Sequence, residues 1–258
     1  MKFGICCGIE SAALVKEMGY DYFECTFSGI GNMTDEEFED FKNKVFELDF
    51  YPEAMNVMLP GKFRLTGDEA DLAPVVPFLE KAFARAAQLK TAVVVFGSGG
   101  ARNVPEGFDK AKAWDQLVEY LNIAGDIAAK NGVNIAIEPL RFGESNIVNL
   151  VAEGAYLAAR VNKPSVRCLA DYYHVAMNEE SCEGIPAFGH RLEHCHIARK
   201  EGRAYPLPTD DQDYMPFFSA LKAAGYDKRL SVEGTAYNGI DQDGPKSLKL
   251  MKELISRL

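Results

Sequence analysis

The strongest constraint on the fold is a regular alternation of apolar, strand-like runs with helix-like segments along the whole 258-residue chain. The runs have the short, continuously apolar character of strands that are buried on both faces of a parallel sheet. Alternation of this kind builds either an open, doubly wound sheet or a closed (β/α)8 barrel. The eight predicted strands lie at 2–7, 20–27, 51–58, 91–97, 134–139, 166–171, 192–197 and 229–234.

Eight strand–helix units in about 250 residues favour the barrel over the open sheet. An open sheet that binds a dinucleotide needs a G-x-G-x-x-G motif directly after its first strand, and CCGIESA at 6–12 lacks it. No Pro/Ser-rich linker or break in composition divides the chain. We therefore expect an α/β protein with a single (β/α)8 TIM barrel domain over residues 1–258.

Charge and hydropathy exclude two classes of partner. The formal net charge of −10 opposes binding to a phosphate backbone, so no nucleic-acid partner is expected. No run approaches the 18 or so apolar residues of a membrane span, so no membrane partner is expected either. The six cysteines are scattered without a C-x-x-C pair, which favours a reducing, cytoplasmic setting.

Four polar, metal-compatible side chains stand near the ends of four successive predicted strands. Glu138, Asp171, His196 and Glu233 are separated by 33, 25 and 37 residues, which suits one strand–helix unit each. Because the carboxyl ends of all strands in a parallel barrel share one rim, these side chains should converge there. Each residue alone has an ordinary structural explanation as a strand-end, capping or core residue, but the four together predict a shared metal site.

The ligand set indicates the kind of metal. Three carboxylates and one imidazole suit one divalent ion; we favour Mn²⁺, and Zn²⁺, Mg²⁺, Co²⁺ or Fe²⁺ remain possible. A structural zinc site would be rich in cysteine and closed. His194 and His196 share a strand face, and His196 is taken as the ligand because it is nearer the strand end. Glu24 and Glu53, in the second and third strands, are not assigned to the site.

Four motifs carry a family resemblance: IEPLR at 137–141, LADYYH at 169–174, HCHIA at 194–198 and VEG at 232–234. At these motifs the chain resembles the xylose isomerase-like barrel superfamily and its sugar phosphate isomerase/epimerase branch, which includes ketose 3-epimerases and hydroxypyruvate isomerases. The resemblance implies that Glu138, Asp171, His196 and Glu233 hold the metal and that His174 contacts substrate. It also implies a substrate-binding Arg after H-x-H. Arg199 and Arg203 are the candidates, and neither has the epimerase spacing.

The implied activity is that of a divalent-metal-dependent sugar or sugar-phosphate isomerase or epimerase. Glu138 and Glu233 would act as acid and base through an enediolate. The alternative is a metal-dependent dehydratase of a cyclic polyol ketone on the same scaffold. Arg199, Lys200 and Arg203 form a cationic cluster for which phosphate recognition is one interpretation and a solvated loop another. The expected partner is a small sugar or sugar phosphate, and a homo-oligomer is possible.

Two other functions fit the chain less well. A nucleic-acid repair enzyme of this superfamily would need more His ligands and less negative charge. A catalytically inactive sugar-binding protein would be expected to lack one of the two carboxylate bases. The glycine-rich segment GSGGARN at 97–103 lacks the G-K-[ST] ending of a phosphate loop, so it predicts a flexible barrel loop.

Overall fold

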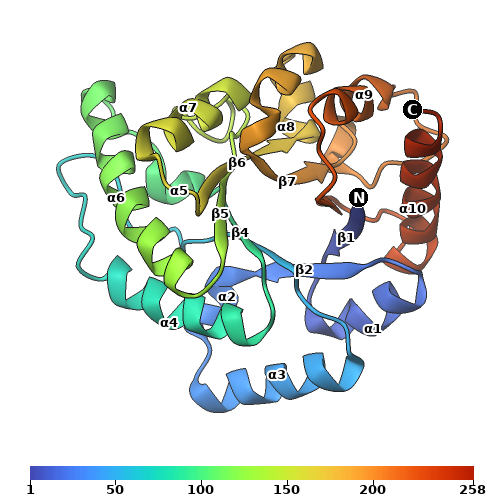
Figure 1. The fold of residues 1–258 in the computed structure, drawn as a ribbon, viewed down its shortest axis with the longest axis horizontal. Coiled ribbons are helices and arrows are strands. Elements are labelled where there is room, and N and C mark those ends of the chain that lie inside the picture. The colour runs from blue at the N-terminus through green and yellow to red at the C-terminus, as the bar shows by residue number, and fades with distance from the viewer.

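The computed structural model describes residues 1–258 as a closed parallel barrel with an outer layer of helices (Figure 1). Each strand pairs parallel with the next, and β8 pairs with β1 to close the sheet. The predicted (β/α)8 fold is therefore confirmed. The strands are β1 Lys2–Cys6, β2 Tyr22–Thr26, β3 Ala54–Asn56, β4 Val93–Phe96, β5 Asn134–Ile137, β6 Val166–Asp171, β7 Leu192–Ile197 and β8 Arg229–Val232.

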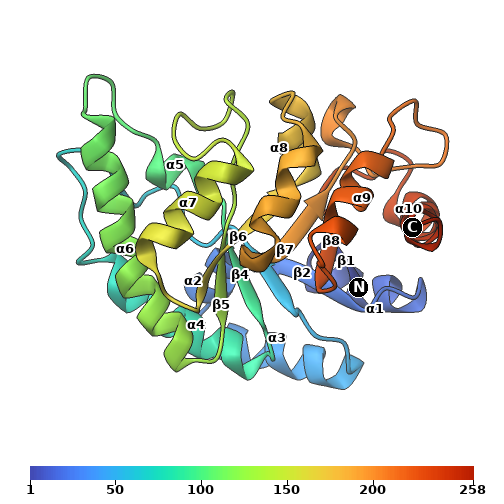
Figure 2. The same ribbon diagram turned by 45° about the horizontal axis from the view of Figure 1, so that its top comes forward.

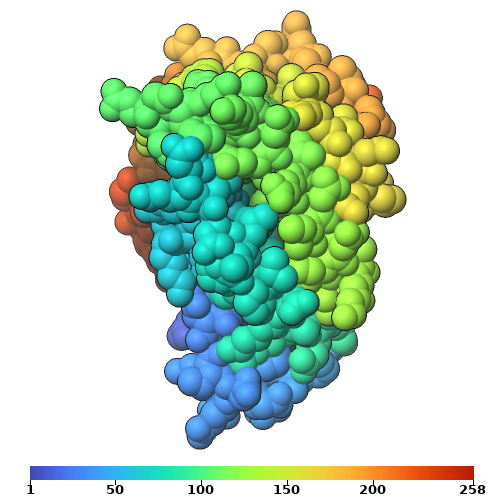
Figure 3. All heavy atoms as spheres, turned by 90° about the vertical axis from the view of Figure 1, so that its left-hand side faces the viewer, coloured from blue at the N-terminus to red at the C-terminus, as the bar shows by residue number.

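Helices cover the outer face of the barrel on all sides (Figure 2). On one side the segments of α4, α6 and α7 form a continuous outer surface (Figure 3). No helix is both long enough and apolar enough to cross a membrane. The α-helices are α1 Ile9–Glu17, α2 Phe27–Asn32, α3 Asp35–Leu48, α4 Val75–Gln88, α5 Gly99–Arg102, α6 Lys110–Lys130, α7 Val151–Val161, α8 Tyr172–Met177, α9 Met215–Ala223 and α10 Ile240–Ser256.

Local sequence signals explain several helix starts. Thr34 caps α3: its hydroxyl accepts from the Glu37 N–H, while the Glu37 carboxylate accepts from the Thr34 N–H at 2.8 Å. Asp109 caps α6 by accepting from the Ala111 N–H at 2.8 Å. Apolar faces of these helices then pack on the strands in one core cluster of 65 buried residues, which lies mainly between helices and barrel.

A second, smaller apolar cluster fills the barrel interior. Its members alternate along the strands with outward-facing residues, as expected for a parallel sheet buried on both faces. Below them, toward the amino ends of the strands, Glu53 pairs with Lys2 at 2.6 Å and Arg229 at 2.8 Å. The rim at the carboxyl ends is therefore separated from the opposite end by a packed layer. The cluster consists of Tyr22, Ala54, Val93, Val95, Ala136 and Leu169.

The segment before β7 is a 3-10 helix, η1 (Cys182–Arg191), with Pro186 inside it. One segment differs from the expectation. The loop expected at 97–103 contains the short helix α5, and Arg102 at its end is fully buried.

Candidate metal centre

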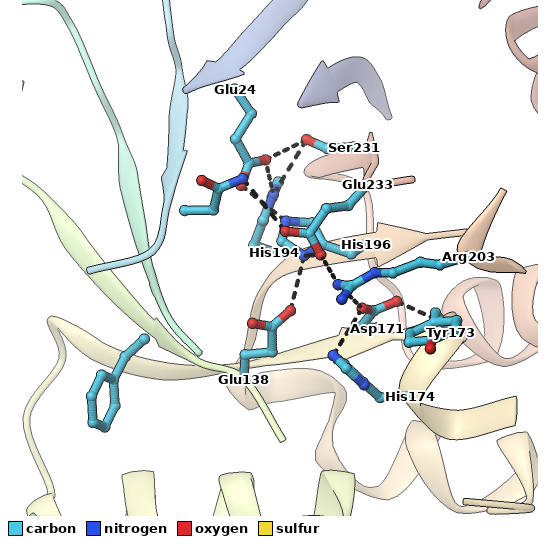
Figure 4. Close-up of polar contacts among 12 residues, drawn as sticks. Glu24, Glu138, Asp171, Tyr173, His174, His194, His196, Arg203, Ser231 and Glu233 are labelled. Atoms are coloured by element: carbon cyan, nitrogen blue, oxygen red, sulfur yellow. Dashed lines mark hydrogen bonds and ion pairs between the residues drawn. The ribbon is translucent and has the colours of Figure 1, made fainter. Parts of the chain in front are cut away.

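The four predicted ligands come together at the carboxyl ends of β5 to β8 (Figure 4). Glu138, Asp171, His196 and Glu233 each offer an atom, and these atoms lie within 4.8 Å of one another. Nδ1 of His196 is 3.0 Å from Oε1 of Glu138 and 3.4 Å from Oε2 of Glu233. Barrel closure produces this arrangement, because it brings residues up to 95 positions apart in the chain to one rim.

Asp171 shows most directly that the cluster fits a cation. Its Oδ1 caps α8 by accepting from the Tyr173 N–H at 2.8 Å. Its Oδ2 is buried and has no hydrogen-bond partner. Burial raises the pKa of Asp171 above its usual value. The Arg203 guanidinium is 3.7 Å from this oxygen, but it also pairs with Glu233, so one guanidinium serves several carboxylates. A buried carboxylate oxygen that accepts no hydrogen bond, in a group of three carboxylates, is stabilised by further positive charge. Three carboxylates and one imidazole with open geometry fit a divalent ion with exchangeable positions.

Glu24, which was not predicted to belong to the site, lies directly behind His196. Its Oε1 is 3.0 Å from Nε2 of His196, and its Oε2 is 2.8 Å from Nε2 of His194. The Ser231 hydroxyl also donates to Oε2 of Glu24, at 2.6 Å. Burial alone would raise the pKa of Glu24, but the two imidazoles outweigh it and hold that pKa well below its usual range. A carboxylate that binds the far nitrogen of a ligand His fixes the ring orientation and increases its basicity.

One sequence signal could have identified Glu24. In a strand buried on both faces, a charged residue requires buried partners, and Glu24 shares the inward face of β2 with Tyr22. Glu53, the other acidic residue left unassigned, lies at the opposite end of the barrel with Lys2 and Arg229.

The structure brings two of the three predicted substrate contacts to the cluster. The Arg203 guanidinium pairs with Glu233 and is 3.7 Å from Oδ2 of Asp171. It also lies over the Tyr173 ring, 4.7 Å from the centroid. His174 is buried, and its Nε2 is 3.4 Å from Oδ2 of Asp171. Since Nδ1 of His174 accepts from the Arg141 N–H at 3.1 Å, Nε2 carries the ring proton in the neutral form.

Arg199 takes a different direction from Arg203. Its guanidinium pairs with Asp210 at 3.1 Å and donates to the Glu201 carbonyl at 3.1 Å. The turn between the two arginines includes Gly202 at φ 66°, followed by Arg203 at φ 47°. This turn directs Arg203 toward the cluster and leaves Arg199 on the loop.

A cavity of about 380 Å³ adjoins the cluster on the side of β1, β2 and β3. Cys6, Glu24 and Asn56 line its inner end, and the Asn56 amide nitrogen is 3.4 Å from Oε1 of Glu233. Its outer wall is largely apolar, and its lining contains no Lys or Arg. The outer wall includes Ile9, Ile30, Met33 and Phe41.

A family model of the xylose isomerase-like TIM barrel matches residues 12–255. The chain belongs to that family. The resemblance inferred from its four motifs is therefore confirmed.

The chain is similar in sequence to several sugar epimerases. The chain is 32% identical over 130 residues to L-ribulose 3-epimerase of Methylomonas sp. strain DH-1, covering 50% of this chain and 45% of that protein. It is 26% identical over 196 residues to D-psicose 3-epimerase of Agrobacterium fabrum, covering 73% of this chain and 66% of that protein. In both cases the match spans less than two thirds of the relative's own length.

Solved structures of xylose isomerase-like barrels share the fold over the full length. D-psicose 3-epimerase crystallised in the presence of D-fructose superposes with a TM-score of 0.85 at 20% identity, covering 99% of both chains. The IOLI protein, solved with a bound zinc atom, superposes with a TM-score of 0.75 at 20% identity, covering 100% of this chain and 99% of that one. At this identity the likeness concerns the fold.

The first prediction is that metal affinity rises with pH across the neutral range. Burial opposes a charged His196, but Glu24 and Glu233 outweigh it and raise the pKa of His196 well above its usual value. The proton on His196 stabilises the metal-free fold at pH values below the pKa that His196 has in the unfolded chain. This contribution to the free energy of unfolding is lost as the pH rises through the higher pKa of His196 in the folded protein. A metal ion must displace the same proton, so binding should release about one proton and strengthen as pH rises.

Isothermal titration in buffers of different ionisation enthalpy measures that release. His190→Gln removes an exposed imidazole outside the cluster and should leave the release unchanged. A metal affinity that stays flat across neutral pH would contradict the proton competition.

The second prediction is that Glu24→Gln weakens metal binding by about 10- to 100-fold, because the amide no longer orients and polarises His196. Glu53→Gln is the matched control, since it removes a carboxylate from the other end of the barrel. Metal dissociation constants and the thermal stability of the metal-free proteins should be measured for both. Equal metal affinity in the two variants would disprove the role of Glu24.

Proposed function

We propose that this chain is a divalent-metal-dependent epimerase that inverts the carbon next to the carbonyl of a ketose. The supporting observation is that two carboxylates, Glu138 and Glu233, reach the metal cluster from β5 and β8, which are not neighbours in the barrel. Figure 4 shows the two side chains entering the cluster from different sides. Inversion requires one group that removes a proton from one face of a carbon and another that returns a proton to the opposite face.

Glu138, Asp171, His196 and Glu233 would hold the ion. When bound, the ion supplies positive charge that stabilises the negative charge developing on substrate oxygens. Burial opposes ionisation of Glu233, but His196 and Arg203 outweigh it and lower the pKa of Glu233 to about 2, so this carboxylate is ionised at neutral pH. Glu233 is therefore in the unprotonated form that a base requires.

Proton transfer then involves only these two carboxyl groups. Glu233 takes the proton from the substrate carbon, and the C–H electron pair moves into a new double bond to the carbonyl carbon as the carbonyl oxygen becomes negative. The resulting enediolate accepts a proton on its other face from the Glu138 carboxyl. For the cycle to balance, Glu138 carries this proton on one oxygen and would hold the ion through the other. The two carboxyl groups finish with exchanged protonation states, and the reverse reaction uses them in the opposite order.

Arg203 and His174 would position the substrate. Both carry N–H groups beside Oδ2 of Asp171, so a substrate oxygen bound near this atom can accept hydrogen bonds from them. No specific observation favours the dehydratase alternative.

The third prediction tests the two-carboxylate proposal. The Mn²⁺-loaded protein, incubated with ketohexoses and ketopentoses in D₂O, should place deuterium at the inverted carbon, detected by NMR. Glu138→Gln and Glu233→Gln should each lower kcat by about 10²- to 10⁴-fold. Glu144→Gln removes a carboxylate that contacts Arg141 and Arg203 outside the cluster and should retain most activity. Deuterium incorporation without inversion would overturn the epimerase proposal.

We also propose that the substrate carries no phosphate. Arg199 is paired with Asp210, Arg203 with Glu233, and the adjoining cavity has Glu10 and Glu24 in its lining but no Lys or Arg. The charged side chains that line this cavity are all acidic, so a phosphate dianion there would find no cationic partner in the cavity wall.

The fourth prediction follows from this charge distribution. The kcat/KM for a ketose phosphate should be at least about tenfold lower than for the free ketose, and Glu10→Lys should narrow the difference. Glu17→Lys is the matched control, because it makes the same charge change on α1 outside the cavity. Preference of the unmodified protein for the phosphate ester would overturn the proposal.

A further inference from the structure

The glycine-rich segment GSGGARN (97–103) follows β4 and lies directly beside the metal ligand of the next strand. The proposed reaction gives this segment no role. Its last helical residue, Arg102, is among the largest fully buried side chains of the protein. Burial of a guanidinium is unfavourable unless its N–H groups find partners, so the partners of Arg102 indicate what the segment does.

Arg102 donates only to backbone carbonyls that surround Glu138. Its Nη1 is 2.9 Å from the Phe96 carbonyl oxygen, and its Nη2 is 2.7 Å from the carbonyl oxygen of Glu138 itself. A longer contact of 3.3 Å reaches the Val148 carbonyl, on the segment before α7. No carboxylate forms an ion pair with this guanidinium. The side chain therefore joins the ends of β4 and β5.

The contacts of Arg102 complete a closed set of hydrogen bonds around the Glu138 backbone. The Glu138 N–H donates to the Phe96 carbonyl at 3.1 Å, and the same carbonyl accepts from Arg102. The Glu138 carbonyl in turn accepts from Arg102. Both backbone polar groups of this ligand are thus fixed by one neighbouring strand end and one guanidinium.

Gly97, at the start of the same segment, controls the side chain of Glu138. A Cβ atom added at Gly97 would overlap Oε2 of Glu138, so only glycine leaves room for the carboxylate in its observed direction. The two ends of the segment therefore act on the same residue, Gly97 on its carboxylate and Arg102 on its backbone.

We propose that Arg102 is a positioning residue of the metal centre, which holds the Glu138 carboxylate in place through the Glu138 backbone. This inference depends on the metal-dependent function proposed above. It predicts that Arg102 matters for metal affinity beyond any contribution to folding, because a ligand that is held less firmly binds the ion less well.

The matched control is Arg85, another buried arginine that donates to backbone carbonyls. It binds the carbonyls of Ile30 at 2.9 Å and Met33 at 2.7 Å, and it pairs with Asp35. None of these residues belongs to the cluster. Loss of Arg85 should therefore reproduce the stability effect of removing a buried guanidinium without touching Glu138.

The fifth prediction concerns the Mn²⁺ affinities of Arg102→Met, Arg102→Lys and Arg85→Met, measured by titration. Thermal melting of the metal-free proteins first defines a temperature at which all of them are folded. Arg102→Met should weaken Mn²⁺ binding by about 10- to 100-fold, Arg102→Lys should restore part of it, and Arg85→Met should bind normally. Gly97→Ala should weaken binding independently, because it displaces the carboxylate.

The outcomes separate this inference from the function on which it depends. If the unmodified protein binds no divalent metal, the metal-dependent function fails and the inference fails with it. If the unmodified protein and Arg102→Met bind Mn²⁺ within about twofold of each other, only the role of Arg102 is overturned. Should Arg102→Met not fold, Arg102→Lys decides the question: Mn²⁺ affinity within about twofold of the unmodified protein would overturn the role of Arg102, and weaker binding would support it.

Discussion

Closure of eight parallel strands into a barrel is the constraint on which the rest of the structure depends. It places the carboxyl ends of β5 to β8 on one rim and converts four residues that are remote in sequence into neighbours. No individual contact in the cluster is strong enough to do this, since the side chains are mostly acidic and repel one another. The apolar cores on both sides of the sheet hold these like charges together.

In the cluster, acidic side chains surround the imidazole of His196. His196 faces Glu138 and Glu233 through one nitrogen and Glu24 through the other. Arg203 approaches Glu233 and Asp171 from the loop after β7. Arg102 lies behind the Glu138 backbone and bonds only to carbonyls. Three positive or protonatable groups thus approach the carboxylates from different directions, and each direction is set by a different element of the barrel.

The sequence predicted the part of this site that depends on strand periodicity. Glu138, Asp171, His196 and Glu233 close apolar runs, and a parallel barrel leaves one place for such residues to meet. The sequence was less informative where the direction of a side chain depends on a turn. Arg199 and Arg203 were equivalent candidates, and only the left-handed backbone at Gly202 separates their directions. Arg102 was not predicted because a glycine-rich run is typical of a loop. The role of Arg102 depends on the backbone carbonyls that it contacts only in the folded chain.

The packed layer inside the barrel has a consequence for the source of protons. Tyr22, Val93, Val95 and Leu169 are fully buried below the cluster, so they close the route from the amino ends of the strands. Exchange of hydrogen between bulk solvent and the Glu138 and Glu233 carboxyls must then pass through the open mouth. In the proposed reaction, a sugar seated in that mouth would shield both groups, and a hydrogen abstracted from it would be retained in the site until the sugar leaves.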